Sequence, residues 1–420
     1  MRFAVLALSM LMAGTEEVFA KKSEYGADLL LFGAAYQPRL DSPYNPDNML
    51  AGLPRRQIET QARLRLRWEK ESVALSLGPR FGARHDFGTN DASTNSHDKY
   101  AYLQSWLIET RRKSIDAFYS RELMLWGSSQ FASPSNPFFD DTNQVNPFIE
   151  LPSRDFIGVR WHASDRDTFT VIRNVDVGRD SEILRTFRPI NALRVEHVGS
   201  TYALGLNLAQ REERTQLGGD GQVTISDALL LYADLALFKE SRRLIAYRPQ
   251  AGNDWRLGTR DDAGRLYTDV VIGTSYTFEG GSTSTLEFRH NTEGYKPGEL
   301  RDLAAFSMEQ AVRFINPNPQ VSGPAASQLS VLVQPYARSF GRNYMHVQYI
   351  DRQLVRDTSL VLQLTYGVDT NDSVVTTVVS HDLNDRMRLS ANFSVPVGSR
   401  FGEQRRYLNG AIFVGMTASF

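Results

Sequence analysis

The chain has 420 residues, with 47 Lys and Arg against 48 Asp and Glu, so its formal net charge is −1. That balance excludes a general nucleic-acid binder, because no basic excess is available to neutralise phosphates. The absence of Cys excludes disulfide frameworks, thiolate zinc sites and iron–sulfur clusters. Aromatic residues are frequent, with 5 Trp, 17 Tyr and 23 Phe, although mean hydropathy is negative. This combination is typical of a barrel with a polar lumen.

Residues 1–20 have the pattern of a secretory signal peptide. Arg2 supplies a positive start, residues 3–13 are apolar, and Val18 and Ala20 are small enough for cleavage after Ala20. The alternative is a buried N-terminal helix. We therefore expect an exported protein whose residues 21–420 form a single domain. No apolar run beyond this segment is long enough for a membrane-spanning helix.

The rest of the chain alternates between apolar and polar residues with a period of two, which is the pattern of half-buried strands. Near the C-terminus, Leu389, Phe393 and Val397 interleave with Ser390, Asn392 and Ser394. A soluble sandwich would also alternate, but three features favour a transmembrane, antiparallel, up-and-down β-barrel. The apolar faces continue for about ten residues, the connections alternate between short and long, and the last strand ends in outward-facing Phe420. This all-β fold predicts an outer-membrane location.

Eighteen strands are predicted, with both termini on the side of the short turns. Sixteen strands remain an alternative if 225–249 is misread. The expected spans are 25–36, 57–69, 72–84, 98–110, 113–122, 155–163, 167–175, 190–199, 201–211, 225–238, 242–249, 267–279, 283–293, 343–352, 358–368, 373–382, 385–397 and 410–420. A barrel of this size is too wide for side chains alone to fill, so it must hold a channel or an inward-folded loop.

Two connections are long enough to fold inward, at about 123–154 and 294–342. The first is rich in turn-forming Asn-Pro pairs. The second contains one predicted short helix, 299–314, which must end before Asn316-Pro317-Asn318-Pro319. We assign 329–340 to irregular loop. Long loops in compact proteins are usually lids or constrictions, and a disordered external loop is the alternative.

Alternation places a set of arginines on the lumen side of the predicted wall. They are Arg63, Arg65, Arg67, Arg80, Arg160, Arg194, Arg289 and Arg388. Fewer acids share that face, namely Asp28, Glu196, Asp234, Asp269 and Glu287. Guanidinium groups bind carboxylate and phosphate in a bidentate way, so these arginines are candidate pore-lining, anion-binding residues. The alternative is that they pair with the acids and stiffen the wall.

An enzyme is not predicted. The seven His residues are scattered, and Ser380-His381-Asp382 cannot form a relay because neighbours in a strand point to opposite faces. No cofactor, metal site or nucleotide-binding motif is expected.

The segment Phe118-Tyr119-Ser120-Arg121-Glu122-Leu123-Met124-Leu125-Trp126-Gly127, continuing through Asn136-Pro137-Phe138 to Pro152-Ser153-Arg154, resembles a strand and loop of large porin-like families of Gram-negative outer membranes. In those families a Gly-Arg-Gln strand end precedes Trp-Gly, whereas Ser120-Arg121-Glu122 stands here. The architecture is also similar to that of alginate-export barrels, which pass an anionic polysaccharide. The resemblance implies that Arg121 lines the pore and that Trp126, Asn136 and Asn146 belong to a constriction loop.

Two classes of function remain. The first is an outer-membrane channel for passive passage of polar anionic solutes or of an acidic exopolysaccharide, and export would also involve a periplasmic partner. The alternative is a surface polysaccharide-binding barrel with a loop-closed lumen, in which Trp126, Phe138, Phe139 and Phe148 stack on sugar rings unless they simply pack within the loop. Both readings predict contact with outer-membrane lipid and lipopolysaccharide, and recognition of Phe420 by the barrel assembly machinery.

Overall fold

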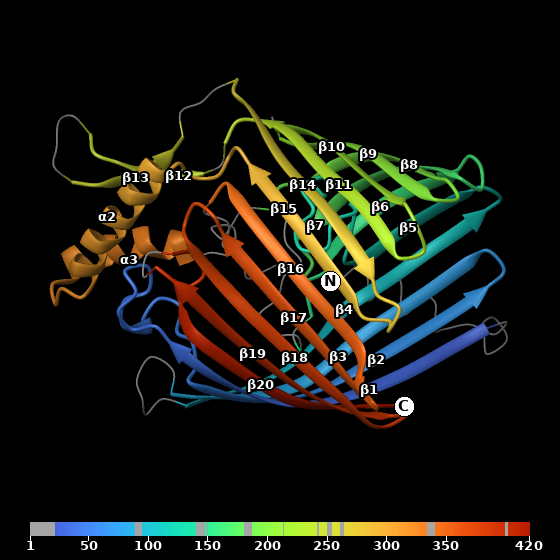
Figure 1. Ribbon diagram of the computed structural model, residues 1–420, viewed down its shortest axis with the longest axis horizontal. Helices are drawn as coiled ribbons and strands as arrows, with labels where there is room; N and C mark the ends of the chain where they lie inside the picture. The colour runs from blue at the N-terminus through green and yellow to red at the C-terminus, as the bar shows by residue number, and fades with distance from the viewer. Residues whose placement is uncertain are drawn as a thin grey trace, which may run out of the picture.

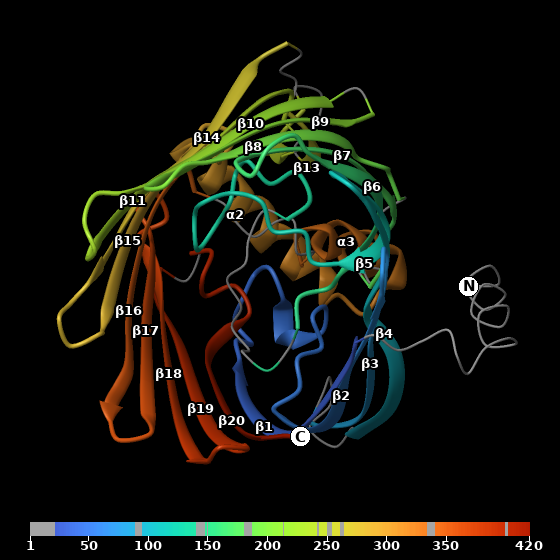
Figure 2. The ribbon, with the colours of Figure 1, turned by 90° about the vertical axis from the view of Figure 1, so that its right-hand side faces the viewer.

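The chain folds into one closed antiparallel barrel (Figures 1 and 2). The computed structural model describes residues 22–88, 95–139, 148, 150–179, 187–212, 214–241, 243–249, 254–260, 264–333, 341–399 and 402–420. The eighteen strands of the barrel are β1 (Lys22–Pro38), β2 (Arg56–Lys70), β3 (Val73–Phe87), β4 (Asn95–Arg112), β5 (Ile115–Glu122), β6 (Arg154–His162), β7 (Asp167–Asp176), β8 (Asn191–Val198), β9 (Tyr202–Arg211), β10 (Arg214–Thr224), β11 (Leu229–Lys239), β14 (Leu266–Thr277), β15 (Thr283–Asn291), β16 (Asn343–Val355), β17 (Thr358–Gly367), β18 (Asp372–Asn384), β19 (Met387–Gly398) and β20 (Leu408–Ser419).

The first and last strands close the barrel. β1 pairs with β2 on one side and with β20 on the other, where Asp28 lies opposite Ser419 and Gln37 opposite Gly410. Each other strand pairs with its neighbours in sequence, except that β11 pairs directly with β14. The predicted eighteen-strand antiparallel barrel is therefore confirmed.

The identity of two strands was predicted wrongly. Residues 214–224, which were not assigned to a strand, form β10, whereas the predicted strand 242–249 contains only β12 (Leu244–Tyr247). β12 pairs with β13 (Arg256–Thr259) in a separate hairpin outside the barrel. The apolar alternation of β10 is interrupted by Gly218, Gly219 and Gly221, so the sequence pattern gave no strand signal there.

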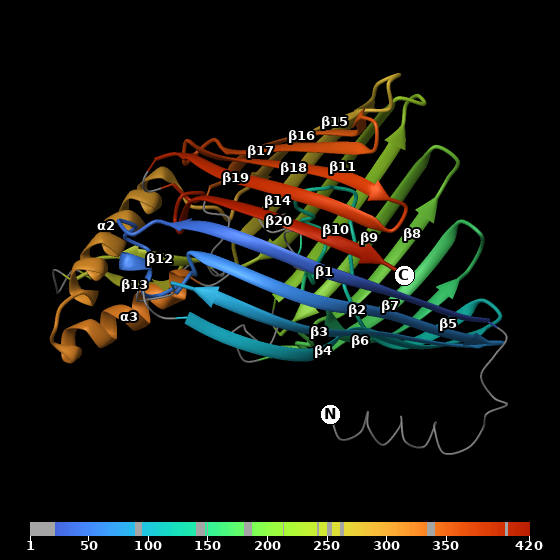
Figure 3. The ribbon, with the colours of Figure 1, turned by 90° about the horizontal axis from the view of Figure 1, so that it is seen from below.

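The two ends of the barrel differ. One end carries the short hairpin turns and the C-terminus, and the other carries β12–β13 and two helices (Figures 1 and 3). The helices are α2 (Pro297–Phe314) and α3 (Pro319–Val333), and a short 3-10 helix, η1 (Pro46–Asn48), lies in the connection between β1 and β2. The predicted helix is confirmed as α2. A second helix begins at Pro319, a position where proline is favoured, so the described part of 329–340 is helical and not irregular.

Buried apolar side chains hold these helices to the connections at this end. Leu303 and Phe306 of α2 pack with Leu332 of α3, Ala246 of β12 and Tyr44. Neither described helix is long and apolar enough to cross a membrane.

The two faces of the wall have opposite character. In β9, Leu204, Leu206 and Leu208 face outward and are about half exposed, with 52%, 63% and 49% accessibility, whereas Asn207 and Ala209 between and beside them are buried. The same alternation in β20 turns Ile412 and Val414 outward and Phe413 inward. The barrel therefore presents an apolar outer belt and a largely polar interior.

Candidate functional site

The connection between β5 and β6, residues 123–153, enters the barrel and is called the crossing loop below (Figure 2). Its described parts are 123–139, 148 and 150–153. Its first half contacts β10, β11 and β15, and its second half contacts β1, β2, β3 and β20 on another part of the wall. The described parts of the loop are thus held by two separate sets of strands inside the barrel.

Two buried carboxylates fix the first half of the crossing loop. Asp234 of β11 accepts hydrogen bonds from Ser133 Oγ at 2.8 Å and from the Ser135 amide at 2.7 Å. Glu287 of β15 accepts hydrogen bonds from the Gln130 amide at 2.5 Å and from the Tyr232 hydroxyl at 2.8 Å. Neither carboxylate is exposed, so both contribute to holding the loop and not to contacting a passing solute.

Aromatic packing and a side-chain amide shape the same half of the loop. The ring of Trp126 lies edge-on to Phe138 at 5.1 Å, and Phe138 lies edge-on to Phe156 of β6 at 4.9 Å. Asn136 donates to the Met124 carbonyl at 3.0 Å and accepts from the Phe138 amide at 3.0 Å. Asn136 therefore stabilises the turn of the loop.

Asn146, the third predicted constriction residue, lies outside the described residues. The four loop aromatics are buried, with 8%, 2%, 8% and 8% exposure for Trp126, Phe138, Phe139 and Phe148. This burial agrees with packing within the loop and not with the alternative in which their rings stack on sugars.

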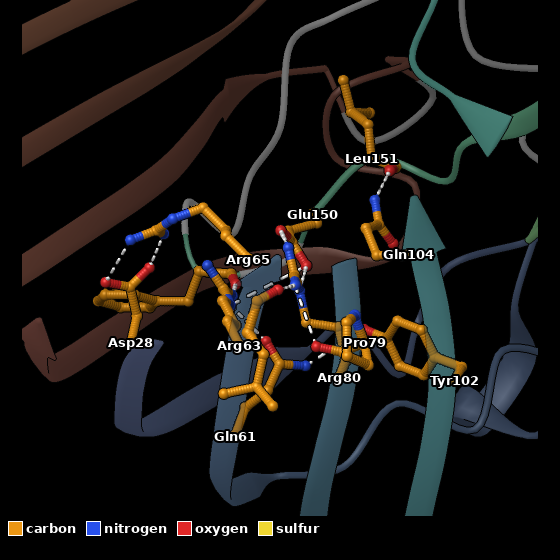
Figure 4. Close-up of polar contacts among 12 residues, drawn as sticks. Asp28, Gln61, Arg63, Arg65, Pro79, Arg80, Tyr102, Gln104, Glu150 and Leu151 are labelled. Atoms are coloured by element: carbon orange, nitrogen blue, oxygen red, sulfur yellow. Dashed lines mark hydrogen bonds and ion pairs between the residues drawn. The ribbon is translucent and has the colours of Figure 1, made fainter. Parts of the chain in front are cut away.

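The second half of the loop is held by arginines of β2 and β3 (Figure 4). Arg80 donates to both carboxylate oxygens of Glu150, with Nε–Oε2 and Nη2–Oε1 distances of 2.7 Å each. Arg63 donates to the Phe148 carbonyl and lies 4.0 Å from Glu150. The Phe148 ring stacks on Phe32 of β1 at 5.2 Å. Arg63 and Arg80 are therefore part of the anchor of the loop.

Two further predicted arginines of β2 keep much of their surface exposed inside the barrel. Arg65 pairs with Asp28 of β1 (Figure 4), and Arg67 lies 3.6 Å from Glu69. Their side chains remain 59% and 45% exposed. The inner wall between the anchor and the short turns therefore carries two exposed arginine side chains.

The remaining inward-facing arginines each have an acid within reach. Arg160 lies 4.0 Å from Glu109, Arg194 is 2.8 Å from Asp220, Arg289 is 2.6 Å from Asp269, and Arg388 is 2.6 Å from Asp382. Arg194 and Arg289 are buried, whereas the Arg388 side chain is 59% exposed. Pairing with wall acids, the alternative considered from the sequence, therefore applies to most of the set.

Arg121 does not face the lumen. It shares strand parity with Ile115 and Tyr119, which are exposed on the outer face, whereas Phe118 and Ser120 of the same strand point inward and are buried. Its guanidinium pairs with Asp155 of β6 at 2.5 Å. The predicted pore-lining position of Arg121 is wrong, because strand alternation turns the side chain to the other face.

Sequence reasoning missed Glu150, Arg179 and the part played by β10. The guanidinium of Arg179 lies 3.6 Å above the Tyr102 ring on the inner wall. A Cβ added to Gly218 of β10 would lie 2.8 Å from the Ser135 carbonyl oxygen, so the glycine makes room for the crossing loop. The glycines of β10 were the available signal, since glycine in a strand often marks close backbone approach.

Among the described residues, no group of three or more His, Asp or Glu side chains could hold a metal ion.

Comparisons with known proteins support the fold. No family model matches the chain, and no curated protein sequence matches it. Among solved structures, OccK11 (OpdR) of Pseudomonas aeruginosa matches with a TM-score of 0.56 and 11% identity, covering 96% of this chain and 97% of that one. OccAB3 of Acinetobacter baumannii matches with 0.55 and 10%, covering 96% and 100%. OprD of Pseudomonas aeruginosa matches with 0.51 and 8%, covering 96% of each chain. The predicted likeness to large porin-like barrels is thereby confirmed for the fold, whereas the likeness to alginate-export barrels stays a prediction.

Proposed function

We propose that the chain is an outer-membrane channel for passive passage of small polar solutes, with a preference for anions. One observation carries the proposal: a loop held to two sides of a closed barrel lies inside it next to inward arginines whose side chains remain exposed. Arg80 and Glu150 fix the loop on one side and Asp234 fixes it on the other. A constriction beside a charged, hydrated wall is the arrangement by which wide barrels select small solutes.

The outer belt supports placement in a membrane. Outward residues such as Leu206, Ile272 and Val171 are more than 60% exposed, and an apolar band on the outside of a barrel is stable only against lipid or another apolar surface. Phe420 is 67% exposed, and its backbone pairs with Ala27, so the terminal ring is presented at the end of the barrel. This geometry fits recognition of Phe420 by the barrel assembly machinery.

The exposed arginines support the preference for anions. The side chains of Arg65 and Arg67 remain 59% and 45% exposed although each has an acidic neighbour, and a guanidinium can replace part of the hydration of a carboxylate or phosphate. The buried pairs of Arg194 and Arg289 supply little field to the lumen. The preference for anions should therefore originate mainly on the β2 wall.

The crossing loop favours small solutes over a polysaccharide. A polymer chain would have to displace a segment held by Arg80–Glu150 and by the bonds to Asp234 and Glu287. Burial of Trp126 and Phe138 within the loop also removes the aromatic surface on which the polysaccharide-binding alternative depended.

Planar-bilayer recording of refolded residues 21–420 tests the proposal. We expect stable conductance steps with a reversal potential that indicates anion preference, and partial block by small dicarboxylates. A folded barrel without conductance would refute the channel, and conductance without anion preference would refute the assignment to anionic solutes. Addition of a polyuronate separates the two solute classes. Only a polysaccharide conduit should both be blocked by micromolar polymer and fail to pass dicarboxylates.

A further inference from the structure

Four basic side chains gather on the outer face of β2, β3 and β4, near the barrel end that carries the helices. They are Arg56, His85, His97 and Lys99, and are called the rim patch below. Register brings them together: His85 lies opposite Ile58 and His97, Lys99 lies opposite Ala83, and Arg56 lies opposite Phe87. The rings of His85 and His97 are 5.7 Å apart. Arg56, His97 and Lys99 are exposed and His85 is half-buried.

Strand alternation places the acids of these strand segments on the inner face of the wall, opposite the rim patch. The acids of the same strand segments, Glu59, Asp86 and Asp98, have inward parity. Glu59 bonds the Tyr100 hydroxyl, and Asp86 lies 3.3 Å from inward Arg84. In the described part of the chain, no acid forms an ion pair with a member of the rim patch. Among the described residues of these strand segments, the basic side chains of the rim patch therefore face outward and the acids face inward.

The rim patch lies at one edge of the apolar belt. Outward residues next to it are apolar, including Ile58 and Phe81, which are 50% and 49% exposed. Arg56 is about 12 residues from outward Trp68 near the other end of β2, or about 40 Å along the strand and about 30 Å along the barrel axis at a tilt of about 40°. That separation matches the hydrocarbon thickness of a bilayer. The patch would thus stand at the level of lipid headgroups.

We propose that the rim patch binds the phosphate groups of a phosphorylated lipid in the outer leaflet. The inference rests on the proposed placement in the outer membrane, with the helix-bearing end outside. Arginine, lysine and histidine side chains donate hydrogen bonds to phosphate oxygens, and the acids of the same strand segments, Glu59, Asp86 and Asp98, have inward parity. The acyl chains would lie along Ile58, Phe81 and Leu103 below, so one lipid satisfies both the basic edge and the apolar belt.

Native mass spectrometry of the refolded full chain with lipid A tests the proposal. The variant combines Arg56→Gln, His85→Gln, His97→Gln and Lys99→Gln. The matched control combines Lys70→Gln and Arg112→Gln, which remove outward basic residues of β2 and β4 at the opposite edge of the belt. An unheated gel shift checks that each barrel is folded. The pair Arg56→Gln and Lys99→Gln, at exposed positions only, replaces the fourfold variant if that one does not fold.

We expect the rim variant to bind lipid A at least tenfold more weakly than the wild type and the control to bind it unchanged. Dephosphorylated lipid A should bind the wild type as weakly as lipid A binds the variant. Equal binding by variant and wild type would overturn the proposal, and displacement of lipid A by millimolar inorganic phosphate would show a small-anion site instead of a lipid site. Conductance of the same samples separates this result from the channel: rim variants should conduct like the wild type whether or not lipid binding is lost.

Discussion

Arg80 of β3 and Glu150 of the crossing loop form a bidentate ion pair inside the barrel, with both N–O distances at 2.7 Å. The Arg80 side chain is 8% exposed and that of Glu150 is 24% exposed. Arg80 also donates to the Leu64 carbonyl at 2.9 Å. This pair joins a wall strand to a segment about 70 residues further along the chain, and it determines where the second half of the loop lies.

The substitution Glu150→Gln should loosen the crossing loop. It leaves the Arg80 charge buried without its partner, and removing one member of a buried pair costs about 3–5 kcal/mol. We expect larger and noisier single-channel conductance and a lower urea midpoint for the vesicle-inserted barrel. Glu69→Gln is the matched control, because its partner Arg67 is 45% exposed and exposed pairs contribute about 0–1 kcal/mol. Equal effects of the two substitutions would contradict the anchor.

The anchor should survive mild acid. Burial pushes the pKa of the Glu150 carboxyl upward, but the hydrogen bond from Arg80 and the charges of Arg63, Arg80 and Arg179 outweigh burial and hold that pKa below its ordinary value of 4.5. Because the folded-state pKa is the lower one, the carboxylate stabilises the anchored loop above the unfolded-state value, and this stabilisation is lost as the pH falls through the folded-state value.

Conductance should therefore stay constant from about pH 7 to about pH 4.5 and rise only below that range. Recording at stepped pH measures the transition. Glu150→Gln should lack it, and a wild-type transition centred above pH 4.5 would argue against the depressed pKa.

Removing the β2 arginines should shift ion selectivity. The triple substitution Arg63→Gln, Arg65→Gln and Arg67→Gln leaves Asp28 and Glu69 without their basic neighbours. A unit charge about 4 Å from an ion contributes about 1 kcal/mol in water, so the anion-to-cation permeability ratio should fall several-fold at low salt, and less at about 1 M salt. Reversal potentials in a KCl gradient measure the ratio, with Lys70→Gln and Arg112→Gln as outward-facing controls. An unchanged anion-to-cation permeability ratio would mean that these arginines have only a structural role.

Two adjacent glycines of β10 offer a test of the other wall. Gly218→Ala puts a Cβ 2.8 Å from the Ser135 carbonyl oxygen of the crossing loop, whereas Gly219→Ala puts one 3.2 Å from the tip of outward Leu206. We expect Gly218→Ala to displace the loop and raise conductance, and Gly219→Ala to leave conductance unchanged. Raised conductance in Gly219→Ala together with unchanged conductance in Gly218→Ala would mean that the loop does not pack against β10.

Most of the barrel could be predicted because strand alternation is local. The period-two pattern of β19 and β20 assigns inward and outward residues correctly without any knowledge of their partners. The strand β10 could not be predicted from alternation, because close approach of the crossing loop requires glycine at positions where an alternating strand would carry larger side chains. The segment that contains β12 was predicted as a strand of the barrel because Leu244 and Ala246 also alternate. The Ala246 side chain instead packs with the buried residues of α2 and α3.

The site was harder to predict because it depends on register between distant segments. The arginines of β2 were recognisable from spacing, but their acid partners lie on neighbouring strands or, for Glu150, in the crossing loop. A one-residue change of parity reverses a side chain, and this is why the motif-based placement of Arg121 was wrong. The helix α3 follows a Pro-rich break that ended α2, and burial of Leu329 and of Leu332, which packs with Leu303 and Phe306 of α2, stabilises it.

The most direct test of the channel uses the absence of cysteine from the chain. Arg65→Cys places one thiol on the inner wall, and Leu66→Cys places one on the outer face of the same strand. Current through each reconstituted variant is recorded before and after a bulky, charged methanethiosulfonate is added. We predict a stepwise loss of current for Arg65→Cys and no change for Leu66→Cys. Persistent current in Arg65→Cys after complete labelling, or equal block of both variants, would contradict a conduction path along the β2 wall.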